Sequence, residues 1–172
     1  MFTLSTATLP VLIHMLSNLE HIVARGQAHA TAKQLDPAAL TNYRLAPDML
    51  PLTRQVLIAC DAAKNGVARV SGIQAPVFED NEQTFDELKA RIAKTLAWLH
   101  TVPATALDGK EEVEVTFPVG KEGTRTMKAG DYLKLWTLPN MYFHVTMTYA
   151  ILRHNGVDLG KRDYLLGSAA AA

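Results

Sequence analysis

The feature that most constrains the fold is a helical spacing of apolar residues that returns in four long stretches of the chain. In each stretch, apolar side chains recur every three or four positions, which places them on one face of an α-helix. The stretches cover residues 3–26, 46–71, 84–101 and 131–155. Because the connections between them are short, the spacing predicts an all-α four-helix bundle, with a less regular α-helical domain as the alternative.

Glycine and proline positions predict where these helices end. Gly26, Gly72 and Gly156 follow the first, second and fourth stretches, and glycine is the residue most often found just after a helix. Pro139 lies inside the fourth stretch, which is apolar on all sides and is therefore expected to be the most buried helix. Since proline lacks an N–H, we expect a kink or break near Leu138, at a cost of about 3 kcal/mol if the helix continues.

Capping residues predict where helices begin. Ala46-Pro47-Asp48 is expected to open the second long helix, with an acidic side chain near the positive end of the helix dipole. Thr84 and Glu87 match a capping box, in which each side chain bonds to the backbone of the other residue. Asp36-Pro37 predicts a further helix of one or two turns.

A short β-hairpin is predicted before the last helix. Residues 112–117 alternate between apolar and polar side chains, which is typical of a half-buried strand. A turn at 120–123 would let residues 124–128 return antiparallel to it. Because an isolated hairpin is only marginally stable, it must pack on the helices.

Length and composition bound the class of protein. A chain of 172 residues is expected to form one domain, here residues 1–167 with a tail at 168–172. With 17 basic and 17 acidic residues, the net charge is zero, which argues against nucleic acid as a partner. Apolar residues nowhere run uninterrupted for the length of a membrane span, so no membrane partner is expected. The single cysteine, Cys60, cannot form an internal disulfide, which is compatible with the cytoplasm.

Histidine spacing gives no reason to predict a metal or another cofactor. Helices present two metal ligands on one face at a spacing of three or four residues, and none of the six histidines has such a partner. His14 and His21 are seven apart and lie opposite the apolar stripe of the first helix, where a solvated or interface face is the simplest interpretation. We therefore predict no metal site.

The polar side chains of the last helix are candidates for a site. His144, Tyr149 and Arg153 lie in an apolar helix and need partners, because a buried unpaired polar group costs about 1–3 kcal/mol. Asp48 and Gln55, seven apart on the second helix, could face His144. One interpretation is a hydrogen-bonded core network. The other is a ligand pocket, with His144 as acid or base and Arg153 as an anion clamp.

Several stretches resemble a known family. Residues 44–49 (RLAPDM) followed by Gln55, residues 139–145 (PNMYFHV), residues 149–156 (YAILRHNG) and residues 160–165 (GKRDYL) are similar to a bacterial branch of the DinB/YfiT-like superfamily, a domain of unknown function. The similarity covers nearly the whole chain. It implies a DinB-like four-helix bundle, often dimeric.

The resemblance also bears on chemistry. Many DinB-like proteins look like metal-dependent enzymes, among them thiol transferases and an isomerase, with one histidine on the second helix and an HxxxH pair on the last. Here the neighbourhood of the pair holds Thr146 and Ala150, with His144 two positions away. We therefore expect a metal-free homodimer that binds a small molecule or acts structurally. The alternative is a divergent transferase or isomerase that uses His144.

Overall fold

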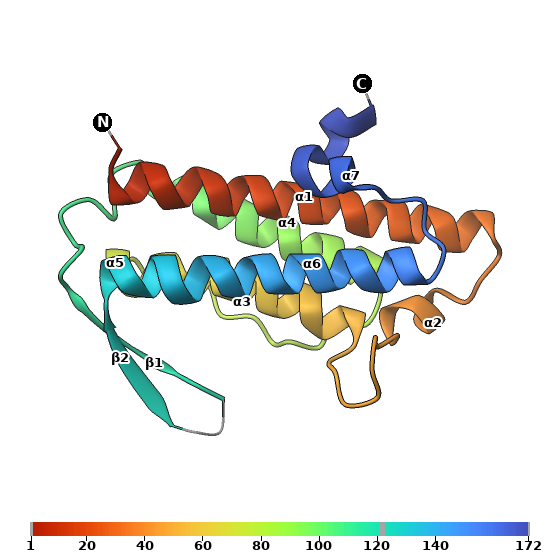
Figure 1. The fold of residues 1–172 in the computed structure, drawn as a ribbon, viewed down its shortest axis with the longest axis horizontal. Helices are drawn as coiled ribbons and strands as arrows, with labels where there is room; N and C mark the ends of the chain where they lie inside the picture. The colour runs from red at the N-terminus through yellow and green to blue at the C-terminus, as the bar shows by residue number, and fades with distance from the viewer. Residues whose placement is uncertain (1, 121–122, 172) are drawn as a thin grey trace.

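Four long helices lie side by side along the length of the molecule (Figure 1). The computed structural model describes residues 2–120 and 123–171; Met1, residues 121–122 of the predicted turn and Ala172 of the predicted tail lie outside them. Helices α1 and α3 each pack against both α4 and α6, so one apolar core fills the space between the four. Their bounds are α1 (Leu4–Ala32), α3 (Leu52–Ser71), α4 (Phe85–Thr101) and α6 (Leu138–His154).

Shorter elements join and flank these helices. The hairpin pairs β1 with β2 antiparallel, with Val115 opposite Met127 and Phe117 opposite Arg125. The structure is thus mostly helical with one small hairpin, as the sequence predicts. The shorter elements are α2 (Pro37–Thr41), β1 (Glu114–Pro118), β2 (Thr124–Lys128), α5 (Ala129–Asp131), the π-helical segment η1 (Tyr132–Thr137), α7 (Lys161–Leu166) and the 3₁₀ helix η2 (Gly167–Ala171).

The predicted helix caps are confirmed where the capping residue and its partner lie within a few residues of each other. The Asp36 side chain accepts a hydrogen bond from the Ala38 N–H at the start of α2. Thr84 and Glu87 form the expected capping box at the start of α4. Gly72 adopts the left-handed conformation that ends α3, with φ of 78°.

Gly26 does not end the first helix, contrary to the prediction, because its role is in packing. α1 continues to Ala32, and Gly26 is buried inside it. A Cβ atom at this position would lie 2.8 Å from Leu152 of α6 and 3.2 Å from Phe85 of α4. The missing side chain therefore lets three helices approach closely. Gly26 is needed for packing between helices and does not end its own helix.

The second long helix begins later than Ala46-Pro47-Asp48. Residues before Leu52 form turns, and Pro51 is the N-cap residue of α3, with ψ of 165°. The residue that precedes a proline is disfavoured in the α conformation, so Leu50 cannot continue a helix into Pro51. Asp48 accordingly lies in an exposed turn outside the helix.

Pro139 is accommodated by a widened turn. α5, η1 and α6 form one continuous helical run (Figure 1). The Leu138 N–H bonds to the Leu133 carbonyl, five residues back, at the end of the π-helical segment. A proline cannot make the regular backbone bond, and the wider turn directly before it relieves the resulting conflict. The irregularity lies where we predicted one, but the helix does not break.

The hairpin packs on the π-helical segment through one aromatic side chain. The ring of Phe117 lies 4.6 Å from that of Tyr132 and 4.9 Å from that of Trp136, measured between centroids. Phe117 and Val115, on the inward face of β1, are both buried. The helices thus supply the packing that an isolated hairpin lacks.

The α6 face turned away from the core is exposed, although the sequence suggested the most buried helix. Phe143 and Tyr142 of α6 are 51% and 38% exposed, and Leu135 of the preceding η1 segment is 59% exposed. Met141, Val145 and Ile151 on the other side are fully buried. The single chain covers one apolar face of this helix and leaves the second open.

Of the described helices, α1 is long and apolar enough to cross a membrane by length and composition. Half of the apolar window is buried inside the fold, against α4 and α6. These contacts are those of a core helix.

Candidate functional site

His144 and Gln55 form a direct contact between α6 and α3. The distance from His144 Nδ1 to Gln55 Oε1 is 2.7 Å, and Gln55 Nε2 donates to the Leu50 carbonyl at 3.0 Å. Because the amide nitrogen is committed to a carbonyl, the amide oxygen must accept, so His144 carries its proton on Nδ1. Burial lowers the pKa of His144 to about 4. At neutral pH the imidazole is therefore uncharged, with its lone pair on Nε2.

The other predicted site residues lie elsewhere. Positions 149 and 153 are turned about 140° and 180° around α6 from His144. The Tyr149 ring packs against Tyr164 with 6.5 Å between centroids, and exposed Arg153 donates to the Val157 carbonyl at 3.3 Å. Asp48 lies in the turn before α3. The structure thus brings His144 and Gln55 together but separates them from Tyr149, Arg153 and Asp48.

The cavities do not coincide with these five residues. Among those formed by the described residues, the cavities of about 660, 600, 240 and 230 Å³ are lined by other side chains. The core-network interpretation accounts for the His144–Gln55 pair as it stands. A ligand role for the predicted residues stays a prediction.

A metal does not fit the residues that would correspond to the superfamily's triad. Thr146 and Ala150 offer no imidazole or carboxylate. Within residues 2–120 and 123–171, no group of three or more His, Cys, Asp or Glu side chains could hold a metal ion together. Zinc sites in proteins use three or four such donors. We therefore derive no chemical step through a metal.

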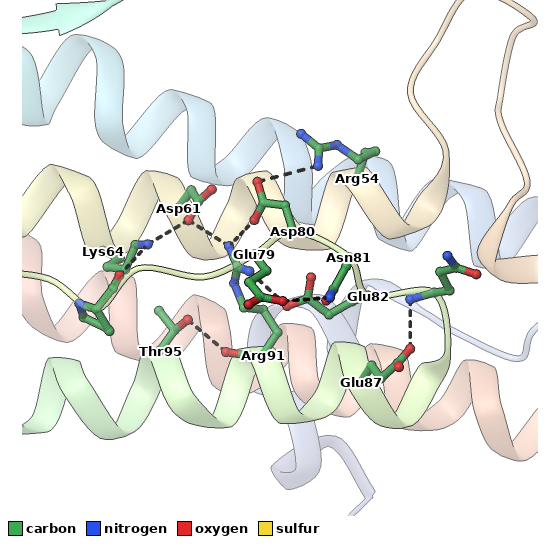
Figure 2. A network of polar contacts seen from close by, with 12 residues as sticks. Arg54, Asp61, Lys64, Glu79, Asp80, Asn81, Glu82, Glu87, Arg91 and Thr95 are labelled. Carbon is green, nitrogen blue, oxygen red and sulfur yellow. Dashed lines mark hydrogen bonds and ion pairs between the residues drawn. The ribbon is translucent and has the colours of Figure 1, made fainter.

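The most extensive polar cluster surrounds Arg91 and was not foreseen from the sequence (Figure 2). Arg91 lies on α4 and is 2% exposed. Its Nη2 donates to Asp80 at 2.8 Å and to Asp61 at 3.0 Å, and its Nη1 donates to Glu82 at 2.9 Å. The guanidinium also stacks over the Phe78 ring, 4.1 Å from its centroid.

A second cation completes this cluster. Lys64 of α3 donates to the Pro76 carbonyl at 3.0 Å, pairs with Asp61 at 3.2 Å and lies 4.4 Å from the Phe78 centroid. Burial disfavours the charged form of Arg91, but the Asp80, Asp61 and Glu82 carboxylates raise its pKa above its ordinary value. The cluster holds the connection 72–84 against α3 and α4, and this role is structural.

A sequence signal for this cluster does exist. Arg91 falls within the apolar stripe of its helix, three residues after Leu88 and next to Ile92, both of which are fully buried. A charged side chain in that position needs buried partners. The acidic run at 79–82 of the neighbouring connection supplies two of them.

The polar face of α1, expected to be a solvated or interface face, is covered in part by the C-terminal segment, while His14 itself stays exposed. His14 Nε2 donates to the Leu165 carbonyl at 2.8 Å, and Asn18 Nδ2 donates to the Tyr164 carbonyl at 2.8 Å. His21 pairs with Asp163 at 2.8 Å. These side chains hold α7 against α1, so the C-terminal segment occupies the face that the sequence left unassigned.

The single cysteine of the chain belongs to the packed core. Cys60 is fully buried, and burial raises the pKa of its thiol to about 12. Since the thiolate is the nucleophile, this cysteine is unreactive at neutral pH.

These observations define a class: a mostly helical protein of the DinB-like kind, with long packed helices and a hairpin before the last. The chain belongs to the family described as "Domain of unknown function (DUF1993)", which matches residues 4–165. It is similar to the crystal structure of a DinB family member protein from Shewanella denitrificans, with 39% identity and a TM-score of 0.87. That match covers 94% of this chain and 91% of the other. No curated protein matches the chain. The predicted resemblance is confirmed.

Proposed function

We propose that this protein is a DinB-like four-helix bundle that works as a homodimer without a metal. The observation that carries the proposal is the exposed apolar stripe of the α5–α6 run, formed by Leu135, Pro139, Tyr142 and Phe143. These positions follow one another by four, three and one residues and so share one helix face. An exposed apolar surface of this kind is typical of an interaction site.

A second copy of the chain is the partner that fits this stripe best. Residues 135–152 contain no Asp, Glu, Lys or Arg, so the face has no charge to mismatch when it meets itself. An isologous contact requires a self-complementary surface, which an uncharged apolar stripe provides. The zero net charge also removes long-range repulsion between copies. A hollow of about 240 Å³ beside Leu135 and Pro139 would accept an apolar side chain of the second copy.

The dimer can be tested by sedimentation equilibrium with two matched variants. Phe143→Glu places a charge within the stripe, and Val77→Glu places the same charge at a position that is 92% exposed and lies in the connection between α3 and α4, outside the stripe. We expect the unmodified protein and Val77→Glu to have twice the chain mass of 18.8 kDa. Phe143→Glu is expected to have the chain mass. A monomeric unmodified protein at high micromolar concentration would refute the dimer.

A second candidate function rests on the His144–Gln55 pair. A neutral imidazole with a free Nε2 lone pair can act as a base, as the alternative of a divergent transferase or isomerase requires. Burial of His144 favours the structural role, because a substrate must reach Nε2.

We place the protein in the cytoplasm, where a single buried cysteine stays reduced.

A further inference from the structure

A cavity of about 660 Å³ lies at the end of the molecule where α1 and the α5–η1–α6 run both begin (Figure 1). This volume is within the range of sites that bind small organic molecules. Leu4 and Ala7 line the cavity from α1, and Leu133 and Leu138 line it from the opposite helical run. Its walls therefore offer an apolar molecule a surface on two sides.

One buried polar side chain lies in this apolar wall. Thr8 of α1 lines the cavity and is 2% exposed. Thr95 and Thr148, which are buried in other helices, donate from their hydroxyls to the carbonyl four residues back. The Thr8 hydroxyl makes no hydrogen bond within residues 2–120 and 123–171. Because buried polar groups normally have a partner, Thr8 points to an occupant of the cavity.

The neighbouring cavity of about 600 Å³, between α1 and the end of α4, differs in this respect. Its buried hydroxyl, that of Ser5, already accepts a hydrogen bond from the Leu107 N–H at 2.9 Å. His14 and His100, which also line it, are exposed and can be solvated. The unpartnered group thus belongs to the larger cavity, which is where we place a ligand.

The charges around the larger cavity indicate which kind of ligand fits. Every charged side chain that lines it is exposed. Lys128 pairs with Glu112, and Lys134 pairs with Asp131 at 2.9 Å, so an anionic ligand would find no cation that lacks a carboxylate. The buried part of the wall carries no charge, and a ligand charge placed there would be desolvated without a partner. The group that reaches Thr8 must therefore be polar but uncharged.

We propose that this cavity binds a small, uncharged, largely apolar molecule with one polar oxygen, which bonds to the Thr8 hydroxyl. The apolar body lies between Leu4 and Ala7 on one side and Leu133 and Leu138 on the other. A threonine hydroxyl can donate and accept, so it can meet either a hydroxyl or a carbonyl oxygen of the ligand. The proposal does not rest on the dimer, because Thr8 and the apolar walls lie outside the exposed stripe.

The ligand class can be tested by fluorescence titration with four probes that share one ring system. 2-Naphthol is uncharged and carries a hydroxyl, 2-methylnaphthalene lacks the oxygen, and 2-naphthoate and 2-naphthylmethylamine carry opposite charges. We expect saturable binding of one 2-naphthol per chain and binding at least about tenfold weaker for both charged probes. Absence of saturable 2-naphthol binding would overturn the proposal. Equally tight binding of either charged probe would overturn the uncharged class.

Two variants with matched controls locate the site. Thr8→Val removes the hydroxyl at nearly constant volume, and we expect 2-naphthol to lose about fivefold in affinity while 2-methylnaphthalene binds as before. Thr148→Val, at another buried helical threonine, is the control. Ala7→Trp fills the cavity and should abolish binding of both probes, whereas Ala97→Trp on the exposed face of α4 should not. Circular dichroism checks that each variant is folded. If folded Ala7→Trp binds 2-naphthol normally, or Thr8→Val leaves its affinity unchanged, the site is not this cavity.

The exposed stripe is a second surface to which an apolar probe could bind, so it needs its own control. Phe143→Glu should bind 2-naphthol like the unmodified protein, whether the chain is then a monomer or a dimer. Loss of binding in Phe143→Glu would assign the probe to the stripe and overturn the cavity proposal. Normal binding in a monomeric Phe143→Glu would support the cavity and the dimer independently of each other.

Discussion

Helix α3 is held to its two neighbours by buried polar contacts of opposite character. Toward α4, Asp61 meets the permanently charged Arg91 in a cluster of three carboxylates and a second cation. Toward α6, Gln55 meets the neutral His144 in a pair with one hydrogen bond between them. Arg91 stays charged because its pKa is raised further above its ordinary value, whereas the neutral contact depends on an imidazole that must stay unprotonated. The two sides of α3 should therefore respond differently to mutation and to acid.

The largest effect is expected on the charged side. Arg91→Met keeps much of the aliphatic stem but leaves Asp61, Asp80 and Glu82 without their shared cation. Removing one partner of a buried ion pair costs about 3–5 kcal/mol, and we expect the lower end because the carboxylates are 14–36% exposed. Urea unfolding measures the loss. Arg162→Met on exposed α7 is the control and should change the free energy of unfolding by less than about 0.5 kcal/mol. An equal effect of both variants would contradict a structural role for the cluster.

On the neutral side, acid should destabilise the protein through His144. Its pKa is lowered from 6.5 to about 4 in the folded state, so the unfolded chain binds the proton more readily. The stabilisation is complete above pH 6.5 and is lost as the pH falls toward 4, by about 3 kcal/mol in all. Urea unfolding between pH 7 and pH 4 measures this slope. His144→Gln should flatten it, and an unchanged slope in that variant would assign the effect to other groups.

A substitution at Gln55 should convert the neutral contact with α6 into a charged one, like the contact with α4. Gln55→Glu places a carboxylate 2.7 Å from the Nδ1 position, where Oε1 now lies. A nearby negative charge favours the imidazolium, so the pKa of His144 should rise from about 4 toward its ordinary value of 6.5. Proton NMR of the imidazole follows the titration. An unchanged pKa would mean that the two side chains do not interact in solution.

The sequence predicted those parts of the fold that short-range chemistry determines. Thr84 with Glu87, Asp36 with its own helix and Gly72 act within a few residues, and each is found as expected. Alternation at 112–117 likewise located β1. Gly26 shows the limit: the same residue type ends a helix or permits close packing, and only the position of Leu152 decides between them.

The candidate site was less predictable, because it depends on contacts between distant segments. The pairing of Gln55 with His144 was predicted from their expected placement on facing helices. Tyr149 and Arg153 come five and nine residues after His144, and the helical repeat alone already turns them away from it. The partners of Arg91 lie 9 to 30 residues away: Asp61 on α3, and Asp80 and Glu82 in a connection that carries no periodic pattern.

The smallest effect is expected from Lys64, the second cation of the charged cluster, and it distinguishes the contribution of Lys64 from that of Arg91. Lys64→Met removes the bond to the Pro76 carbonyl and the pair with Asp61, but Asp61 keeps Arg91 and the methionine still packs near Phe78. We expect a loss of about 1 kcal/mol in the free energy of unfolding. Lys89→Met is the control, since Lys89 pairs at the surface with Asp86, which is 76% exposed. Hydrogen exchange should speed up in residues 73–83 of Lys64→Met and not in the control. Unchanged exchange there would mean that Arg91 alone holds the connection against the helices.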